Sequence, residues 1–435
     1  MKKYDEYKDS GVEWIGEVPK HWEVCKLKHY SHIVLGKMLM TSPPKDSEGL
    51  YTLEKYLKSK NVGWLQLFLD EDNIDEMWFN QYEKSIYKLQ ENDIVMNEGG
   101  DIGKVSCWRG VDFDCYIQNS INKITADYNR VNAGFLCYWL YNLSSLGYFW
   151  SIVSQISIAH LTKEKLSNSP VVLPPISEQT AIATYLDTHC AKIDNLISIQ
   201  QKRIALLQEL KQSVITHAVT KGLNPNVEMK QSGVEWIGDV PKHWEVTKLK
   251  FKYHFQTGAT PNTGKKENFE GELKWANISD LNGSVVYDTT KHINKKAASK
   301  CSMNISPKGS LMYSFKLSVG SVAFCGEDMY TNEAIASFIP QKNDLKYLFY
   351  CAPIFIIHNA NRNIYNAPLL NQELIKNALI CLPSLTEQAA IASYLDHKCA
   401  TIDTSISNAQ HQIDLLQEYK QSLITEVVTG KYKVC

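Results

Sequence analysis

The chain has 435 residues, a length typical of two or three domains. Hydrophobic residues make up 44% and charged residues 21% of the sequence, which excludes a disordered chain, a collagen-like repeat and a disulfide-rich scaffold. The 46 Lys and Arg against 47 Asp and Glu give a formal net charge of -1 at pH 7. No global positive field attracts a polyanion, so any nucleic-acid surface must be local.

Cysteine usage and the N-terminal sequence indicate the compartment. The eleven cysteines are dispersed and form no C-x-x-C pair, as is typical of free thiols in a reducing environment. The first residues lack an apolar signal core, and we expect a cytoplasmic protein. The uncharged stretch between Arg130 and Lys163 is interrupted by Asn, Ser and Gly, so it predicts no membrane span. We expect a buried helix at 133–143 and a second element after the turn that follows it.

Two blocks of sequence occur twice in the same order. The segment 10–28 recurs at 232–250 with two differences, and the segment 173–187 is matched at 382–396. The sequence between these blocks differs strongly between the halves. Repeated blocks that enclose two different segments indicate a protein with two binding sites of different specificity. A duplicated structural domain in which one half has drifted is the alternative.

The second block of each half opens a long helix. Prolines followed by Ser177 or Thr386, with Glu178 or Glu387 next, are typical of a helix start. Each helix is expected to end near a glycine, and about 44 residues at 1.5 Å per residue give roughly 65 Å. Apolar residues at three- and four-residue steps form a coiled-coil seam in each helix. The seam consists of Ile182, Leu186, Cys190, Ile193, Ile197, Ile204, Leu207, Leu210 and Val214, and of Ile391, Leu395, Cys399, Ile402, Ile406, Ile413, Leu416, Tyr419 and Leu423.

Because a single helix cannot bury such a stripe, we expect the two helices to pack on each other, antiparallel and related by a pseudo-twofold axis. Cys190 and Cys399 would then lie toward opposite ends, which argues against a disulfide between them. The variable segments contain short strand-like runs separated by Gly, Asn and Pro. These runs are 93–96, 103–108 and 120–124 in the first segment, and 273–278, 284–287, 310–314, 320–324 and 334–338 in the second, with a helix expected near 345–352.

The predicted fold class is therefore α+β (mixed): two globular domains separated by two long antiparallel coiled-coil helices, with a pseudo-twofold internal repeat. The expected divisions are 1–172 for the first repeat segment and variable domain, 173–229 for the first long helix, 230–381 for the second repeat segment and variable domain, and 382–435 for the second long helix.

Motifs of catalysis are not found in the sequence. It has no G-x-x-x-x-G-K-[ST] loop, no G-x-G-x-x-G loop, no G-x-S-x-G elbow and no Asn/Asp-Pro-Pro-Tyr segment of the kind that methylates bases. The spacing of His21, Cys25, His29 and His32 would suit zinc on a helix. The repeated frame has Thr247 and Phe251 in place of Cys25 and His29, so zinc is not favoured.

DNA readers combine Lys or Arg for phosphates with Asn, Gln, Arg or Lys in loops for base edges, interleaved with aromatic residues. Such residues cluster at 55–61 and 97–104 in the first variable segment, and at 260–266 and 291–296 in the second. The candidates for DNA contact are Lys58, Lys60, Asn97, Lys104, Thr260, Asn262, Lys265, Lys266, Lys295, Lys296, Lys316, Asn363 and Tyr365.

The repeated blocks carry a family resemblance over nearly the whole chain. The openings Pro-Pro-Ile-Ser-Glu-Gln and Pro-Ser-Leu-Thr-Glu-Gln, the long helices after them, and Ser-Gly-Val-Glu-Trp-Ile-Gly in both halves closely resemble the DNA specificity subunit of Type I restriction-modification systems. The segments 258–262, 273–281 and 330–334 look like the family's target-recognition pattern, with 40–45 and 118–120 as weaker counterparts. The resemblance adds Trp275, Asn277 and Asn332, and Lys45, Gln118 and Asn119, to the candidate DNA contacts.

The resemblance implies that each variable segment is a target-recognition domain for one half of a split duplex target. It implies that the long helices space these domains and dock two methyltransferase subunits, and that motor-nuclease subunits join for cleavage. The chain itself would be non-catalytic and hold no cofactor, with S-adenosylmethionine in the methyltransferase subunits and ATP with Mg²⁺ in the motor. A coiled-coil scaffold that binds protein alone, or an enzyme of unrecognised type, remain the alternatives.

Overall fold

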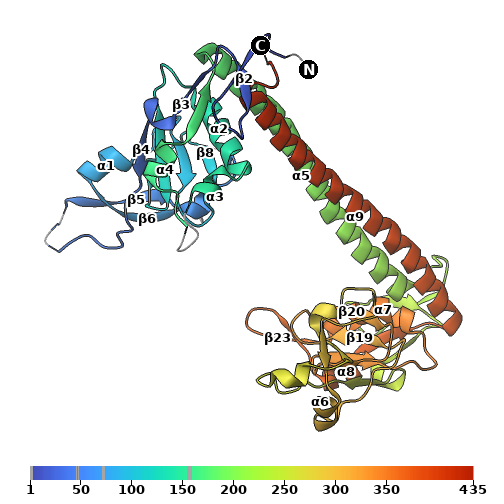
Figure 1. Cartoon of the computed structure of the whole chain (residues 1–435). Helices are drawn as coiled ribbons and strands as arrows, with labels where there is room; N and C mark the ends of the chain where they lie inside the picture. The colour runs from blue at the N-terminus through green and yellow to red at the C-terminus, as the bar shows by residue number, and fades with distance from the viewer. Residues whose placement is uncertain (1–2, 46, 48, 71–73, 154–158, 435) are drawn as a thin grey trace. The chain divides into compact units, whose positions relative to one another are not determined.

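A computed structural model describes residues 3–45, 47, 49–70, 74–153 and 159–434. The chain forms two compact units, which we call unit 1 (residues 1–201 and 411–435) and unit 2 (residues 202–410). Two long helices, α5 (Ile176–Lys221) and α9 (Leu385–Val428), each contribute residues to both units (Figure 1). Their lengths of 46 and 44 residues and their ends agree with the expectation, but they begin at Ile176 and Leu385, before the expected Ser177 and Thr386.

The globular part of unit 1 is built from short strands and four short helices. These are β1 (Tyr7–Asp9), β2 (Glu17–Pro19), β3 (Glu23–Lys26), β4 (Ser31–Leu35), β5 (Tyr51–Leu57), β6 (Asp75–Asn80), α1 (Gln81–Tyr87), β7 (Ile94–Asn97), β8 (Val105–Cys107), β9 (Tyr116–Ile117), β10 (Ile121–Ala126), α2 (Ala133–Ser145), α3 (Tyr148–Ile152), α4 (Lys163–Ser167) and β11 (Pro170–Leu173).

Unit 2 follows the same order, except that it adds β17 and has the strands β23 and β24 where unit 1 has α3. Its elements are β12 (Met229–Gln231), β13 (Asp239–Pro241), β14 (Glu245–Lys248), β15 (Phe255–Thr257), β16 (Leu273–Ala276), β17 (Val285–Val286), β18 (Lys291–Ile293), α6 (Lys295–Lys300), β19 (Leu311–Ser314), β20 (Val322–Cys325), β21 (Tyr330–Thr331), β22 (Ile335–Phe338), α7 (Leu345–His358), β23 (Asn361–Arg362), β24 (Pro368–Leu369), α8 (Gln372–Asn377) and β25 (Leu379–Leu382). The strands and helices expected from the sequence are therefore present, with ends shifted by a few residues.

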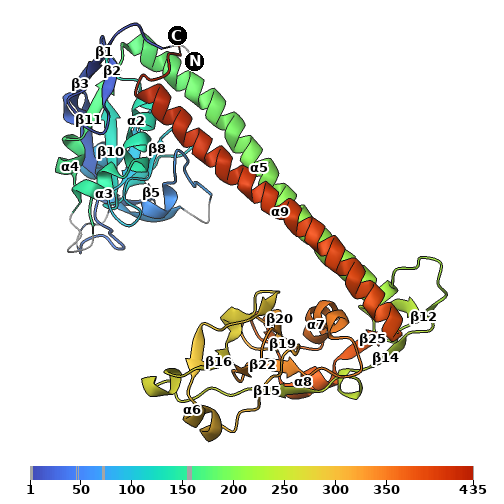
Figure 2. The same ribbon diagram turned by 45° about the vertical axis from the view of Figure 1, so that its right-hand side comes forward.

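The sheet order repeats between the units. Figure 2 shows β20, β19, β22 and β15 of unit 2 in the order in which they pair. Unit 1 has a four-stranded sheet, β4-β10-β7-β8, and a three-stranded sheet, β6-β5-β9, in which β5 and β9 run parallel. Unit 2 has the equivalent order β15-β22-β19-β20, extended by β17, and the three-stranded sheet β18-β16-β21, in which β16 and β21 run parallel. Sequences that resemble each other only faintly thus build one plan twice.

Alternate residues of the central strand face two different cores, because successive strand side chains point to opposite faces. In β19, Leu311 and Tyr313 pack in the core that contains α7, whereas Met312 packs with Ala276 of the three-stranded sheet. All four residues of β19 are buried. Its first three residues, Leu311, Met312 and Tyr313, pack into these cores, and the strand joins the two sheets into one domain.

The two long helices pair antiparallel within each unit. In unit 1 the Nζ atom of Lys420 lies 2.7 Å from an Asp194 carboxylate oxygen, and in unit 2 Lys211 makes the equivalent 2.7 Å contact with Asp403. Most seam residues are buried or half-buried, but Leu210 is 50% and Tyr419 is 55% exposed. The seam prediction was wrong at these two equivalent positions. There the adjacent lysines, Lys211 and Lys420, are less exposed than the seam residues.

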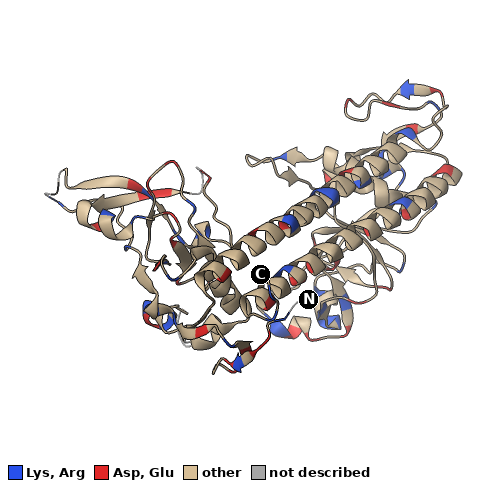
Figure 3. Cartoon of the chain, turned by 90° about the horizontal axis from the view of Figure 1, so that it is seen from above, with Lys and Arg blue, Asp and Glu red and all other residues tan. Residues whose placement is uncertain are grey.

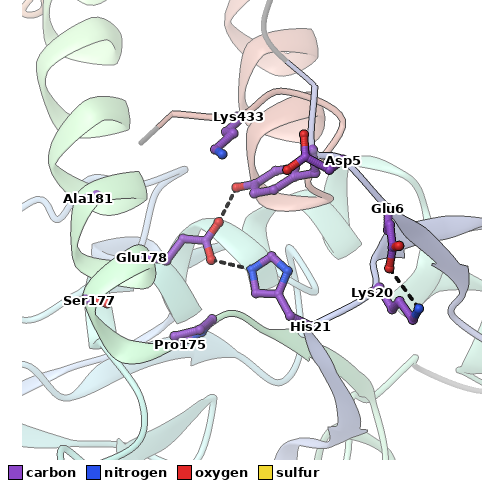
Figure 4. Close-up of a pocket in the computed structure, with 10 residues that line it drawn as sticks. Asp5, Glu6, Lys20, His21, Pro175, Ser177, Glu178, Ala181 and Lys433 are labelled. Carbon is purple, nitrogen blue, oxygen red and sulfur yellow. Dashed lines mark hydrogen bonds and ion pairs between the residues drawn. The ribbon is translucent and has the colours of Figure 1, made fainter.

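The repeated frame is attached to the start of each long helix through a glutamate. In unit 1 the Glu178 carboxylate accepts hydrogen bonds from Trp22 Nε1 at 3.2 Å and from the Tyr4 hydroxyl. It also lies 2.9 Å from His21 Nε2 (Figure 4). In unit 2, Glu387 binds the equivalent His243 and Trp244 in the same way. A negative charge in the first helical turn is favoured by the helix dipole, so this contact stabilises the helix start.

The possible zinc set is not assembled. Cys25 lies on β3 and pairs with Val171 of β11, so the helical spacing that would gather the four side chains does not exist. Burial, followed by the charge of Glu23, raises the pKa of the Cys25 thiol to about 12, which disfavours the thiolate that binds metal. Among the described residues no group of three or more His, Cys, Asp and Glu is placed to hold a metal ion.

The uncharged stretch after Arg130 forms α2 and α3, as expected. Eleven of the thirteen residues of α2 are buried, around Phe135 and Trp139. In the described part of the chain, no helix has the length and apolar character required to cross a bilayer. Cys190 and Cys399 are free thiols and belong to different units.

Candidate nucleic-acid interface

Four loops of unit 2 meet where the parallel strands β16 and β21 end, and we call them the loop edge of unit 2: residues 258–260, 277–280, 315–320 and 331–334. Backbone hydrogen bonds hold the four loops together. Asn332 N donates to Ala276 O at 3.0 Å, Ala259 N to Thr331 O at 3.0 Å, and Phe315 N to Ala334 O at 3.0 Å. A Cβ at Gly258 would lie 1.7 Å from Thr331 O, so this crossing requires glycine.

Asn332 presents an amide at this edge. Its Oδ1 accepts a hydrogen bond from Ala334 N at 3.1 Å, and its Nδ2 makes no hydrogen bond within the described residues. The oxygen keeps a second lone pair and the nitrogen keeps both N–H donors, so the group offers the acceptor and the donor that bidentate binding to adenine requires. Thr260 donates to Glu333, and Asn277 Nδ2 lies 3.4 Å from the Thr290 hydroxyl. The predicted Thr260, Asn277 and Asn332 therefore share one edge.

A basic cluster lies beside the loop edge and consists of Lys265, Lys266, Lys295 and Lys296. The short helix 266–269 and the start of α6 are joined by Asn294, whose Nδ2 donates to Glu267 O at 2.6 Å. Asn262, in the loop before the short helix, is exposed and accepts a hydrogen bond at its carbonyl from Asn268 Nδ2 at 2.9 Å. All four lysines are exposed and form no ion pair among the described residues. Since Lys and Arg are interspersed with Asp and Glu along the chain (Figure 3), this grouping is local.

The structure assigns Trp275 a supporting role in place of DNA contact. The side chain is 4% exposed, its Nε1 donates to Ala259 O at 3.0 Å, and its ring packs edge-on against Phe269. A buried indole cannot reach a base, so Trp275 positions the loop edge and is removed from the contact set. Lys316, Asn363 and Tyr365 lie in loops at the surface, and the Asn363 Oδ1 accepts hydrogen bonds from Tyr365 N and Ala367 N at 2.9 Å each.

Unit 1 has an equivalent edge with different side chains. Gln118 occupies the place of Asn332: its backbone N donates to Leu57 O at 3.0 Å, and its Oε1 accepts from Ser120 N at 3.1 Å. The Gln118 Nε2 donates to Asn119 Oδ1 at 2.5 Å. A Cβ at Gly36 would lie 2.3 Å from Gln118 O and 2.7 Å from Ile117 O, so this crossing also requires glycine. The weak sequence counterpart of Asn332 is therefore its structural counterpart.

The basic candidates of unit 1 are largely paired. Lys58 and Lys60 both lie against Asp75, and the hydrogen bond with Asp75 is the main cause that raises the pKa of Lys58 and lowers that of Asp75. Lys104 contacts Asp101 at 2.5 Å. Lys45 is exposed. A lysine that is already paired gains less from a phosphate, so the basic surface of unit 1 is weaker than that of unit 2.

Asn97 was wrongly expected to face DNA. Its side chain is fully buried, and its Nδ2 donates to Ser59 O at 3.2 Å. It lies at the end of the buried strand β7, where it fixes the loop that follows. The sequence did not point to Leu317, which lies in an exposed loop of unit 2, or to Arg362, which is exposed on the short strand β23. Their signal is tertiary, because a single leucine in a loop has no distinctive pattern.

Comparison with known proteins agrees with this geometry. The family model described as Type I restriction modification DNA specificity domain matches residues 19–209 and 241–413. The chain is 24% identical to the Type I restriction enzyme MjaVIII specificity subunit of Methanocaldococcus jannaschii, over 96% of this chain and 94% of that protein. It is 20% identical to the EcoBI specificity subunit of Escherichia coli, over 79% and 74% of the two chains.

Solved structures show the same fold. A chain from a structure described as the basis of complex assembly and conformational transition of the type I R-M system superimposes with a TM-score of 0.71 at 15% identity, over 95% of this chain and 99% of that chain. The HsdS subunit from Thermoanaerobacter tengcongensis gives 0.50 at 14% identity, over 95% and 98%. Since the family model covers both halves of the sequence and both halves repeat one fold, the chain belongs to the family of Type I restriction modification DNA specificity domains.

Proposed function

We propose that unit 1 and unit 2 each read one half of a split duplex DNA target. The observation that supports this most directly is that the same loop edge is built twice with different polar groups. Gln118 and Asn332 occupy equivalent backbone positions, and each keeps an amide at the edge. A repeated frame with changed amides suits two different base sequences, because the base-edge pattern in the major groove distinguishes all four base pairs.

The basic cluster of unit 2 supplies the phosphate contacts in this proposal. Four exposed lysines at the starts of two adjacent short helices fit the backbone of a duplex, whereas Asn277 and Asn332 lie at the neighbouring edge where bases would be read. Glu333 beside Asn332 also suits a base edge, since a carboxylate accepts from the amino group of cytosine and is disfavoured next to a phosphate. Phosphate contacts fix the register, and the amides give specificity.

Repeated apolar residues on the long helices support two equivalent docking sites for partner subunits. Leu206 and Leu210 on α5 are 65% and 50% exposed, and their counterparts on α9, Leu415 and Tyr419, are 50% and 55% exposed. Each pair is spaced by four residues and so forms one stripe on its helix. Exposed apolar stripes mark protein contacts. The repetition fits two copies of the same partner, which we identify as methyltransferase subunits.

Motor-nuclease subunits complete the proposed complex for cleavage. S-adenosylmethionine then binds the methyltransferase subunits, ATP with Mg²⁺ binds the motor, and this chain contributes recognition without catalysis in the cytoplasm. The absence of nucleotide and cofactor loops from the sequence motivates this division of roles.

The experiment is to purify the full chain alone and with its methyltransferase subunits, and to measure DNA binding and methyl transfer for both. We expect sequence-specific binding and methylation of a split target by the complex, and no methyl transfer by the chain alone. Methylation by the isolated chain would overturn the division of roles. A complex that assembles but retains no DNA would favour the protein-binding scaffold.

A further inference from the structure

Three large apolar residues of unit 2 are more exposed than any other large apolar side chain in the described chain. Ile364 is 90%, Leu317 is 86% and Tyr365 is 83% exposed. Ile364 and Tyr365 form the tip of the hairpin between β23 and β24, which extends away from the sheets of unit 2 in Figure 1. Exposure of this degree does not contribute to the core, so these side chains have no role in stabilising the fold.

Leu317 is also in an unfavourable backbone conformation. Its φ is 52°, in the left-handed region that disfavours residues with a Cβ. The equivalent loop of unit 1 has Gly100 at this position, with a φ of 71°. The two loops correspond because Gly320 N donates to Ser314 O as Gly103 N donates to Asn97 O. A leucine where the fold favours glycine, with its side chain in water, indicates a function outside folding.

Both apolar sites lie at the proposed DNA surface. The loop that carries Leu317 belongs to the loop edge, and a Cβ at Gly320 would lie 3.9 Å from Ile357 near the end of α7. The hairpin follows α7 and leads into α8, where Gln372 Nε2 donates to Thr257 Oγ1, next to Gly258, at 3.0 Å. The loop and the hairpin therefore leave the domain beside Asn332 and its neighbours.

A cation precedes each apolar site. Lys316 comes directly before Leu317, and Arg362 lies two residues before Ile364; both are exposed. A lysine or arginine can bind a phosphate of DNA while the apolar side chain beside it contacts the stacked bases. The basic residue at each site therefore favours a polyanion over an uncharged partner.

We propose that Leu317 and the hairpin tip, Ile364 and Tyr365, form an apolar wedge that enters the base stack of the half-site read by unit 2. Proteins that unstack a base step do so with side chains of this kind, and an aromatic ring can stack on the exposed base. Methyltransferases act on a base taken out of the stack, so a wedge here lowers the free energy needed by the partner subunit to extrude its target. This inference rests on the proposed reading of DNA by unit 2.

The test uses the complex of the full chain with its methyltransferase subunits and duplexes that carry 2-aminopurine at successive positions of the target. This base fluoresces more strongly when it is unstacked. We expect binding to raise the fluorescence at one step of the unit 2 half-site. The variant Leu317→Gly should abolish most of this rise and weaken binding of the specific target about tenfold. Ile364→Ser with Tyr365→Ser should act in the same direction.

The glycine variant separates function from folding. Because glycine suits a φ of 52°, we expect Leu317→Gly to keep or raise the melting temperature while it reduces unstacking. Tyr287→Ser is the matched control, since Tyr287 is 63% exposed beside β17 and outside the loop edge. It should change neither the fluorescence nor the affinity, and Leu317→Gly should leave the unit 1 half-site unaffected.

The outcomes distinguish this inference from the proposed function. If the wild-type complex binds no specific DNA, the proposed function fails. If it binds its target with no fluorescence rise, or if Leu317→Gly preserves the rise, the wedge is refuted while DNA reading stands. If Leu317→Gly loses the methyltransferase subunits without DNA, the apolar site is a protein contact and the wedge is also refuted.

Discussion

At the scale of single residues, unit 2 separates two kinds of polar group. Lys265 and Lys266 are charged, exposed and without an ion pair among the described residues. The side chain of Asn332 is held in place, because its Oδ1 accepts a hydrogen bond from Ala334 N at 3.1 Å. A mobile charge suits phosphate, and a fixed amide suits a base edge. The two kinds of contact predict different responses to salt and to sequence.

The amide of Asn332 should discriminate one base pair. Asn332→Ala is expected to relax specificity at one target position by about 1 to 3 kcal/mol, because the bidentate contact to adenine is lost. Competition binding against targets altered one base pair at a time measures this. Asn332→Asp is the matched control for folding, since a carboxylate oxygen still accepts from Ala334 N but donates nothing. An equal loss for every target would contradict base reading.

Lys265 should act on all sequences alike. Lys265→Ala is expected to weaken specific and non-specific binding together and to reduce the slope of log K against log salt by about 0.9, one phosphate contact. Titrations at several salt concentrations give the slope. Lys242→Ala is the control, since Lys242 contacts Glu228 at 2.7 Å in the repeated frame, away from the loop edge. Loss of discrimination with an unchanged slope would speak against a phosphate contact.

Glu387 couples folding to pH. Burial would raise its pKa, but hydrogen bonds from Trp244 and His243 outweigh burial and hold the pKa below the usual 4.5. A carboxyl group whose pKa is lowered by folding stabilises the folded state above its unfolded pKa, and this contribution is lost as the pH falls through the folded pKa. The wild-type melting temperature should therefore fall below about pH 4.5 more steeply than that of Glu387→Gln. Glu209→Gln, at an exposed position of α5, should keep the wild-type profile.

At the scale of elements, the long helices pair with each other, and their length could set the distance between the half-sites. The ion pairs Asp194–Lys420 and Asp403–Lys211 use equivalent residues in the two units, so the antiparallel register is set by the repeat itself. Mutual pairing buries the seam residues. The exposed Leu206, Leu210, Leu415 and Tyr419 remain outside the seam and available to partners.

If the helices set the distance between half-sites, their length should control the unread spacer. We expect seven residues inserted in register into both helices, after Lys202 and after His411, to lengthen the spacer by about three base pairs, since 10.5 Å corresponds to three steps of 3.4 Å. A seven-residue insertion keeps the seam in phase. Methylome sequencing reports the spacer. As a control, seven residues inserted after Asn224, beyond α5, should leave the spacer length unchanged. If the helix insertions also leave the spacer length unchanged, the helices only dock partners.

At the scale of the whole molecule, the two units share one frame and differ in their recognition loops. Exchange of residues 30–169 for another recognition domain should change one half of the target and leave the other half and the spacer intact. The reason is that the frame contacts of Glu178 and Glu387 lie outside the exchanged segment. Methylome sequencing of a host that carries the chimera measures both halves. A folded chimera that alters both halves would show that the units do not read independently.

The sequence alone determined the repeat, the two long helices and the main strands. Local patterns suffice for these, because helix starts, apolar periodicity and strand-like runs are set by neighbouring residues. Asn332 and Gln118 came from the resemblance of segments 330–334 and 118–120 to the family's target-recognition pattern. The apolar spacing also predicted that Leu210 and Tyr419 belong to the seam. Both are exposed, because the paired helix does not cover these positions.

Only the tertiary structure decided which candidates reach the surface. Asn97 and Trp275 are residue types that DNA readers use, but both are buried and donate hydrogen bonds to Ser59 and Ala259. Lys58 is paired with Asp75. Leu317 gave no signal until its φ and exposure were known. Exposure and pairing depend on residues distant in sequence, which the loops bring together across the parallel strands, and no local pattern encodes those contacts.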